Sequence, residues 1–304
     1  MTGQAPHRIC PNEFVRRPGY TGHFAFPPVL SIFPTSIFLL ATVVTGLAAQ
    51  LPPDLASERG EYAAWLASAP LSPYAILALQ PVGTGISIGH EPSDIPLPIA
   101  TRGIAREDRG AITLTQGNTT LTLPRGRPVH LEQFSLVASG GPGRAVIAAY
   151  GQVRNPKPPS YYPFAAPLIF SAALEPPERR GTFRTLGPEG TESDATEAGF
   201  VRMTIAGATA RLRVYRVGGA DDDEAEFVVY FRDATNGKGS YPAGRFLTLE
   251  PLPAGHYRID FNRARNPFCA YSSVYPCPAP WPGNGAPAPI EAGEQYRGAG
   301  GEKR

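Results

Sequence analysis

The sequence has few of the residues on which common catalytic and metal-binding motifs depend. Its 304 residues include only three cysteines, two methionines, two tryptophans and five histidines. It contains no G-x-S-x-G nucleophile elbow, no H-E-x-x-H zinc motif and no phosphate-binding P-loop, and its glycines at 83, 85 and 89 have the wrong spacing for a dinucleotide-binding turn. We therefore expect no cofactor.

The sequence also lacks a strong charge of either sign. Its 28 basic and 26 acidic residues give a formal net charge of +2 at pH 7. DNA- and RNA-binding domains usually carry a basic patch or stripe that contacts phosphates, and none is visible along this chain. We expect no nucleic-acid partner.

The longest apolar run has thirteen residues, IFLLATVVTGLAA at 37–49, and follows Arg16 and Arg17. It is too short for an ordinary membrane span of about twenty residues and has the length of the apolar part of a signal peptide, with small residues before a cleavage point near Ala49. We interpret residues 1–49 as a signal peptide or, alternatively, an uncleaved membrane anchor. Either way we expect export, to a periplasmic or extracellular location or to an anchored one.

Cleavage near Ala49 would remove Cys10 and leave Cys269 and Cys277 as the only pair. In an oxidising compartment a close, even pair predicts a disulfide. A zinc site that adds His256 is disfavoured because the spacing matches no common ligand pattern. The acidic run at 221–224 resembles a solvated hairpin tip more than a calcium loop. We predict no metal site.

Gly and Pro are abundant, with 33 and 35 residues, which is typical of short strands joined by many turns. One helix is expected over 54–69, capped by Asp54 and ended by Pro70, and a second, shorter one over 72–79. Ten segments alternate in hydrophobicity as strands do: 112–115, 119–123, 129–137, 145–151, 182–186, 200–206, 209–217, 226–231, 245–250 and 257–261. We predict a mainly β fold, an antiparallel sandwich or partly closed barrel with one or two short N-terminal helices.

The sequence predicts an organisation in four parts, the first of which contains the apolar run. Residues 1–49 form the signal or anchor and 50–80 a helical lead-in. A β-rich domain follows over 81–295, and a proline-rich stretch with a polar connection at 187–199 divides it, as two sub-domains split near 155 or as a long surface loop. Residues 296–304 are expected to be disordered.

The region from 226 to 294 concentrates polar and aromatic residues, above all in YRIDFNRARNPFCAYSSVYPCP at 257–278. This region resembles the bacterial family catalogued as domain of unknown function 1684. The resemblance is carried by Phe231, Asp233, Ala234, Thr235, Gly237, Tyr241, Gly244, Arg245, Phe246, Leu247, Asp260, Phe261, Asn262, Arg263, Ala264, Asn266, Pro267, Cys269, Ala270, Tyr271, Cys277, Pro278, Pro280, Asn284, Ala292, Gly293 and Glu294. The family has no established activity, so the resemblance implies a fold group and a site region.

Three interpretations of this region stay open. Asp260, Asn262, Asn266 and Asn284 could be scaffolds that bond the backbone of an irregular loop. Asp233 and Asp260 could be the acid and base of a hydrolase acting on an envelope ester or glycoside, with Asn262 or Tyr271 orienting the substrate. A binding module for a small molecule or envelope component is the third, with candidate ligand-binding residues Tyr241, Arg245, Asn266, Tyr271 and Asn284 and an aromatic groove formed by Tyr241, Tyr271, Tyr275 and Trp281.

Overall fold

The computed structural model of the protein describes residues 50–217, 225–278, 281 and 283–298. The predicted signal or anchor at 1–49, the acidic tip at 221–224 and the end of the predicted tail, 299–304, lie outside these residues. Within the described ranges, no helix has both the length and the apolar character needed to cross a membrane.

Helix α1 (Pro53–Ser68) is the one long helix of the described chain. Its buried residues Leu55, Tyr62 and Leu66 lie on one face, as the spacing predicts. The predicted cap is wrong, because the helix starts one residue earlier, at Pro53, and its N-cap position is Pro52. Asp54 instead pairs with Arg263, whose guanidinium lies 2.8 Å from its carboxylate.

The second helix predicted over 72–79 is wrong as well. The buried Ser72 hydroxyl donates to the carbonyl of Leu66 at 2.6 Å and accepts from the amide of Tyr74, which turns the chain at the Ser-Pro step. The chain then enters strand β1 (Ile76–Pro81), whose backbone pairs with strand β9 (Val146–Tyr150). Pairing with a distant strand therefore overrides the local helix signal.

The first β unit is a sandwich of two sheets, here called the N-terminal sandwich. One sheet has the order β1-β9-β8-β7, and the other β3-β2-β4-β5-β6. All pairings are antiparallel except that of β2 with β3. The remaining strands are β2 (Ile86–Gly89), β3 (Ile95–Pro96), β4 (Gly103–Asp108), β5 (Ala111–Gln116), β6 (Thr119–Thr122), β7 (Pro128–Leu131) and β8 (Phe134–Ser139).

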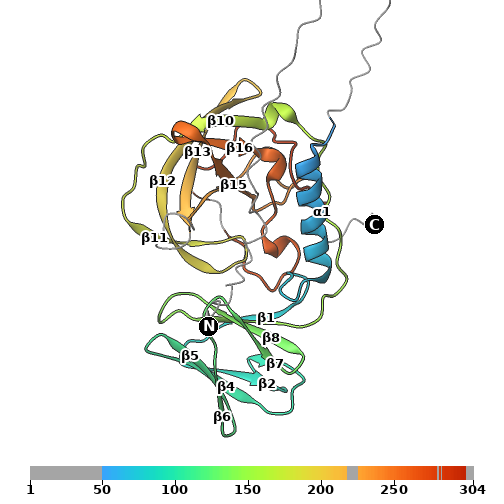
Figure 1. Cartoon of the computed structure of the whole chain (residues 1–304), viewed down its shortest axis with the longest axis vertical. Helices are drawn as coiled ribbons and strands as arrows, with labels where there is room; N and C mark the ends of the chain where they lie inside the picture. Colours follow the sequence, from blue (N-terminus) through green and yellow to red (C-terminus); the bar gives the residue numbers. More distant parts are fainter. Residues whose placement is uncertain (1–49, 218–224, 279–280, 282, 299–304) are drawn as a thin grey trace, which may run out of the picture.

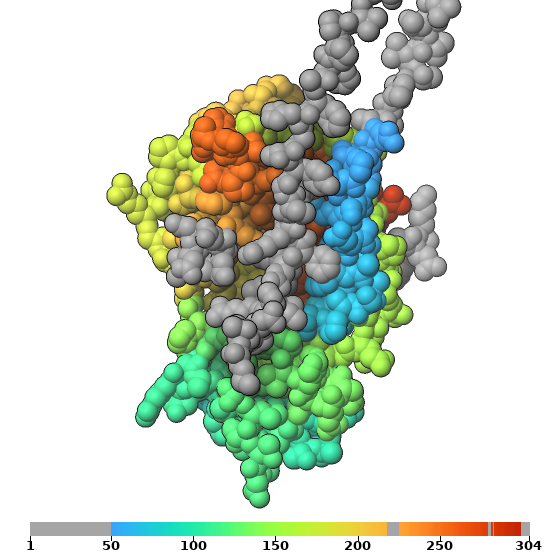
Figure 2. Space-filling view, in the orientation of Figure 1, coloured from blue at the N-terminus to red at the C-terminus, as the bar shows by residue number. Residues whose placement is uncertain are grey.

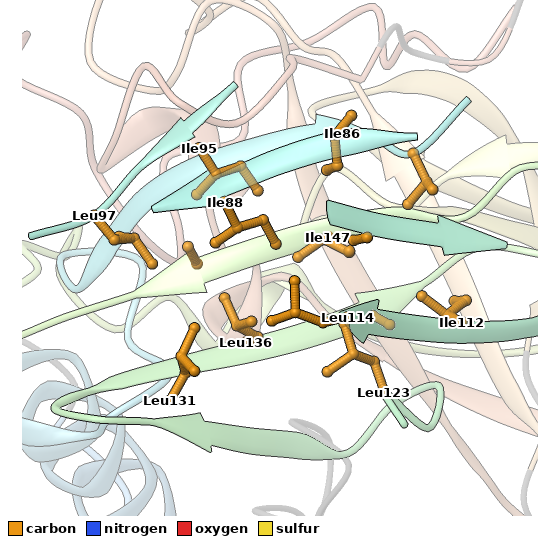
Figure 3. Close-up of a cluster of buried hydrophobic side chains, with 14 of the residues drawn as sticks. Ile86, Ile88, Ile95, Leu97, Ile112, Leu114, Leu123, Leu131, Leu136 and Ile147 are labelled. Carbon is orange, nitrogen blue, oxygen red and sulfur yellow. The ribbon is translucent and has the colours of Figure 1, made fainter. Parts of the chain in front are cut away.

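The core of this sandwich is aliphatic and comes from both sheets. Figure 3 shows Ile88 and Leu114 of one sheet facing Leu136 and Ile147 of the other, and all four are fully buried. The single strand predicted over 129–137 is the hairpin β7–β8, because the chain reverses at Glu132, whose φ is 53°. The chain reverses between β5 and β6 at Gly117, whose φ is 55°.

The second β unit is one seven-stranded antiparallel sheet, here called the larger sheet, with the order β10-β16-β15-β14-β13-β12-β11. Its strands are β10 (Ile169–Ala173), β11 (Thr182–Leu186), β12 (Glu192–Ile205), β13 (Ala208–Val217), β14 (Glu226–Phe231), β15 (Arg245–Pro251) and β16 (His256–Asp260). Short 3-10 turns lie at Ala166–Leu168, Pro253–Gly255, Phe261–Arg263 and Phe268–Ala270. The connection predicted over 187–199 is wrong from residue 192 onward, because β12 starts there and pairs with both β11 and β13.

The larger sheet curls strongly without closing into a barrel. Just beyond β10, Glu175 and Phe200 of β12 exchange two backbone hydrogen bonds of 2.7 and 3.1 Å. The bend requires glycine at 199, where φ is 144° and a Cβ would lie 2.0 Å from the carbonyl oxygen of Glu175. The prediction of a mainly β fold with a sandwich and an N-terminal helix is confirmed.

The elements are arranged so that α1 runs along the larger sheet while the N-terminal sandwich lies at one end (Figure 1). In the space-filling view the blue helix lies directly against the larger unit (Figure 2). The two β units meet through Tyr275, which packs with Ile76 and Ala148 of the sandwich and whose hydroxyl donates to that of Tyr150 at 3.3 Å. The irregular chain of residues 261–278 follows β16 and is here called the polar segment. It contacts α1 through the pair of Arg263 and Asp54, and it contacts β15 through backbone bonds between Arg265 and Phe246.

Candidate functional site

Asp260 and Asn262, both predicted as catalytic residues, form a bonded pair at the end of β16. The carboxylate of Asp260 accepts from the amide of Asn262 at 3.1 Å and from its side-chain Nδ2 at 2.9 Å. Its other oxygen lies 3.2 Å from a guanidinium nitrogen of Arg258. The carboxamide of Asn262 in turn bonds both the N–H and the carbonyl of Ala165, at 2.8 and 3.0 Å. The pair thus fastens the segment before β10 to β16.

The carboxylate of Asp233 is also fully occupied by contacts within the protein. Its side chain and that of Arg245 are both fully buried, and their nearest oxygen and nitrogen are 2.9 Å apart. The second carboxylate oxygen accepts from the backbone and hydroxyl of Thr235, at 2.7 and 2.6 Å, and from the amide of Ile290. Arg245 donates further to the carbonyls of residues 290, 292 and 294. The pair therefore ties β15 to the C-terminal segment.

Asn284 is a third polar side chain that bonds backbone. Its oxygen accepts from the amide of Arg213 at 2.7 Å, and its Nδ2 donates to the carbonyls of Arg213 and Tyr230, both at 3.0 Å. Three hydrogen bonds from one carboxamide hold the irregular chain near 284 against β13 and β14. At this position the structure has the geometry of a scaffold.

The residues of the predicted aromatic groove pack in different places. Trp281 lies against Tyr215, with ring centroids 3.6 Å apart, and donates to the hydroxyl of Thr185. Tyr275 packs against Phe268, and Tyr241 packs edge-on against Tyr296. Trp281, Tyr275 and Tyr241 are each more than nine-tenths buried, so their rings serve as packing surface within the fold.

The predicted disulfide is not formed, because Cys269 and Cys277 are free thiols. The hydroxyl of Tyr241 lies 3.2 Å from the sulfur of Cys277 and 3.2 Å from the carbonyl oxygen of Cys269, to which it donates. Burial, with Cys277 beside it, raises the pKa of the Cys269 thiol to about 12. The even cysteine count indicated a pairing, but it carries no information on whether a bond forms.

Glu294 is the most unusual titratable group in the region. Its residue is 1% exposed, and its two carboxylate oxygens accept from the hydroxyl of Tyr271 at 2.5 Å and from the amide of Asn266 at 2.9 Å. Burial raises the pKa of this carboxyl to about 7, although the two hydrogen bonds and the charge of Arg265 oppose the rise. Glu294 therefore exchanges its proton near neutral pH.

A layer of tyrosines surrounds Glu294. The hydroxyl of Tyr271 also lies 3.1 Å from that of Tyr62 on α1, and its ring meets Tyr74 edge-on. Burial raises the pKa values of Tyr62, Tyr161 and Tyr271 well above the usual range, so these phenols stay neutral. Glu294 is thus enclosed by neutral hydroxyls.

A small pocket lies beside this group, between α1 and the start of the polar segment. Its free volume is about 10 Å³, room for roughly one water molecule. Arg59 of α1 forms one wall, with its guanidinium 4.0 Å from the ring centre of Tyr161 and donating to the carbonyl of Asn262 at 3.1 Å. Other lining residues are Leu55, Glu58, Arg263 and Arg265. With α1 in place, the pocket has no room for a substrate.

Among the described residues, no three His, Cys, Asp or Glu side chains gather in a way that could hold a metal ion. The structure does bring two predicted binding residues, Asn266 and Tyr271, onto one carboxylate. Sequence reasoning named Glu294 only among the residues of the family resemblance and not as a site residue, because a glutamate near the C-terminus carries no signal of burial. It also missed Tyr62, whose place on the apolar face of the predicted helix was the only available clue.

Comparison with known proteins points to one family. The family described as "Protein of unknown function (DUF1684)" matches residues 158–295. No curated protein matches the chain. Among solved structures, the solution NMR structure of an uncharacterized protein from Haloarcula marismortui is 27% identical, covers 46% of this chain and 76% of its own, and gives a TM-score of 0.37.

Proposed function

Because residues 158–295 belong to the DUF1684 family of unknown function, we propose a function from the site geometry: an exported structural or ligand-binding β protein of the cell envelope. A structural role is supported by the hydrogen-bond partners of the polar side chains, which all belong to the protein. Asp233, Asp260, Asn262 and Asn284 direct their hydrogen-bonding atoms at backbone, at side chains or at one another. Export rests on the apolar run at 37–49.

The hydrolase alternative has less support from the same geometry. A general acid or base must reach the proton that it transfers. Asp233 is fully buried against Arg245, and Asp260 is held by Asn262 and Arg258. Both carboxylates would have to break these ion pairs and hydrogen bonds before they could contact a substrate.

Export can be tested with the full chain carrying a C-terminal tag, expressed in a Gram-negative host and fractionated. We expect the tagged protein in the periplasm, with its N-terminus near Gln50. A matched variant that lacks residues 37–49 should stay in the cytoplasm. Recovery of unprocessed wild-type protein from the cytoplasmic fraction would contradict the export part of the proposal.

The structural or binding role needs a separate experiment on the purified protein. In thermal-shift screening against envelope sugars, peptides and lipid headgroups, a compound that raises the melting temperature would indicate the binding role, and the absence of one would favour the structural role. Nitrophenyl esters and glycosides should not be hydrolysed. Asp260→Asn should lower thermal stability, since Asp260 accepts two hydrogen bonds from Asn262. Hydrolysis that disappears in Asp260→Asn while the melting temperature stays unchanged would favour the hydrolase.

A further inference from the structure

Helix α1 is held to the larger unit by two kinds of contact. Near its start, Asp54 pairs with Arg263 and Glu58 pairs with Arg265, each at 2.8 Å. About one turn after Glu58, the hydroxyl of Tyr62 lies 3.1 Å from that of Tyr271, and Tyr271 contacts Glu294 at 2.5 Å. The first contacts are ion pairs, whereas the second ends on a carboxyl whose pKa burial raises to about 7.

The groups that face Glu294 come from every element packed around it. Tyr62 comes from α1, Tyr74 from the turn before β1, Tyr161 from the segment before β10 and Tyr271 from the loop after β16, and each interacts electrostatically with Glu294. The charge of Arg265 lowers the pKa of Glu294, and Arg245 of β15 donates to the backbone carbonyl of Glu294 at 3.3 Å. The guanidinium of Arg265 already pairs with Glu58 and lies 4.3 Å from the ring centre of Tyr62. Ionised Glu294 therefore shares the counter-charge of Arg265 with Glu58.

We propose that Glu294, Tyr271 and Tyr62 form a proton-responsive latch that holds α1 firmly when Glu294 is protonated and releases it more readily when Glu294 is ionised. The inference goes beyond the proposed function and does not rest on it. It concerns the position of α1, whose Leu55, Glu58 and Arg59 form one side of the pocket that Tyr161 also lines.

The hydrogen bonds fix where the proton resides. One oxygen of Glu294 accepts from the amide of Asn266, so the carboxyl proton is carried by the other oxygen and donated to Tyr271. Tyr271 then donates to Tyr62. In the ionised state both phenols reverse direction, and Tyr271 donates to the carboxylate. The chain of bonds survives, but a negative charge is now buried, and movement of α1 would let bulk water solvate it.

The size of the effect follows from the two protonation equilibria. A solvated glutamate has a pKa of 4.5, and the enclosed Glu294 has a pKa of about 7. By linkage, ionisation can therefore raise the opening equilibrium of α1 by up to about 300-fold in all, of which about 30-fold falls between pH 5.5 and pH 9, with most of that change below pH 7.

Hydrogen exchange of the full-length protein, followed by mass spectrometry, measures this opening directly. Protection factors of residues 53–68 and 262–275, corrected for intrinsic exchange, should fall by up to about 30-fold from pH 5.5 to pH 9, mostly below pH 7. In Glu294→Gln, which keeps the shape and both hydrogen bonds, they should be independent of pH. The matched control Glu250→Gln, at an exposed carboxyl of β15, should behave as the wild type.

Three results would overturn the latch. Protection of α1 that is constant from pH 5.5 to pH 9 would show that Glu294 does not control the helix. The same pH dependence in Glu294→Gln would assign the effect to another group. Equal loss of protection in α1 and in the core strands β12 and β13 would show global unfolding instead of local release.

A second measurement does not depend on the stability of Glu294→Gln. Trp65 of α1 stacks on Tyr62, with ring centroids 5.9 Å apart, whereas Trp281, the other tryptophan, packs against Tyr215 of β13. In protein labelled with 5-fluorotryptophan, the 19F signal of Trp65 should shift with a midpoint near pH 7, and that of Trp281 should not. A Trp65 signal that is constant from pH 5.5 to pH 9 would contradict the proposal.

Discussion

The buried pair of Asp233 and Arg245 gives the sharpest test of the structural interpretation. In Asp233→Asn the shape is kept, but the guanidinium loses its only carboxylate partner and meets an amide that is either a weaker acceptor or another donor. Both side chains are fully buried, so water cannot compensate. Removing one partner of a buried ion pair typically costs about 3 to 5 kcal/mol, and we expect Asp233→Asn to lower the free energy of unfolding by about 3 kcal/mol.

Arg245→Met should cost more, because it leaves the carboxylate and the carbonyl oxygens of Ile290, Ala292 and Glu294 without their donor. The double variant should be less destabilised than the sum of the two single variants, since the uncompensated charge is then absent.

The assay is urea unfolding followed by far-UV circular dichroism, with Asp108→Asn, at an exposed position, as the matched control that should leave stability unchanged. A loss of less than about 1 kcal/mol in Asp233→Asn would refute the reasoning, because a buried charge left without its partner lowers the free energy of unfolding by more than that. Strict additivity in the double variant would show that the two residues do not act as a pair.

Three further predictions follow from the site. The pKa of Glu294 is raised in the folded protein, so the folded state binds more protons between pH 4.5 and about 7; stability should fall across that window by about 3 kcal/mol as pH rises, and Glu294→Gln should remove the fall in urea titrations. Asn284→Ala deletes three hydrogen bonds to backbone and should cost about 2 to 4 kcal/mol in the same assay, whereas the exposed Gln133→Ala should cost little. Cys277 is exposed and Cys269 is half-buried with a raised pKa, so a thiol reagent should label Cys277 first and both on unfolding; an intact mass that shows a disulfide would contradict the free thiols.

Much of the fold could be predicted from alternation and turns. The strands at 111–116, 182–186, 208–217 and 226–231 follow an apolar period of two, and each ends at or near a turn residue. The errors have physical causes. Strand β1 looked helical because its pairing partner, β9, lies about seventy residues away, and no local signal reports that. The start of β12 looked like a loop because its sequence, ESDATEAG, has few apolar residues, although Ala195 and Glu197 are buried by neighbouring strands.

The site was predictable in its residue types but not in its connections. Asp and Asn in an irregular segment suggested side chains that bond backbone, and Asn262 and Asn284 do so. Which carboxylate would be enclosed was not predictable, since enclosure of Glu294 depends on Tyr62 of α1, more than two hundred residues away along the chain. The missing disulfide has a similar origin, because two thiols can lie near one another beside Tyr241 without forming a bond.

Glu294 differs from the other polar residues of the segment in one physical respect. The bonds that Asn262 and Asn284 make require an amide, with one donor and one acceptor side, and the structure uses both. At 294 a glutamine could accept from Asn266 and donate to Tyr271 without any cost for burying a charge. A carboxyl offers scaffolding no advantage there, and burial raises its pKa to about 7. What it adds is a proton that can leave near neutral pH, and this property singles out Glu294 as the residue through which the segment can respond to its surroundings.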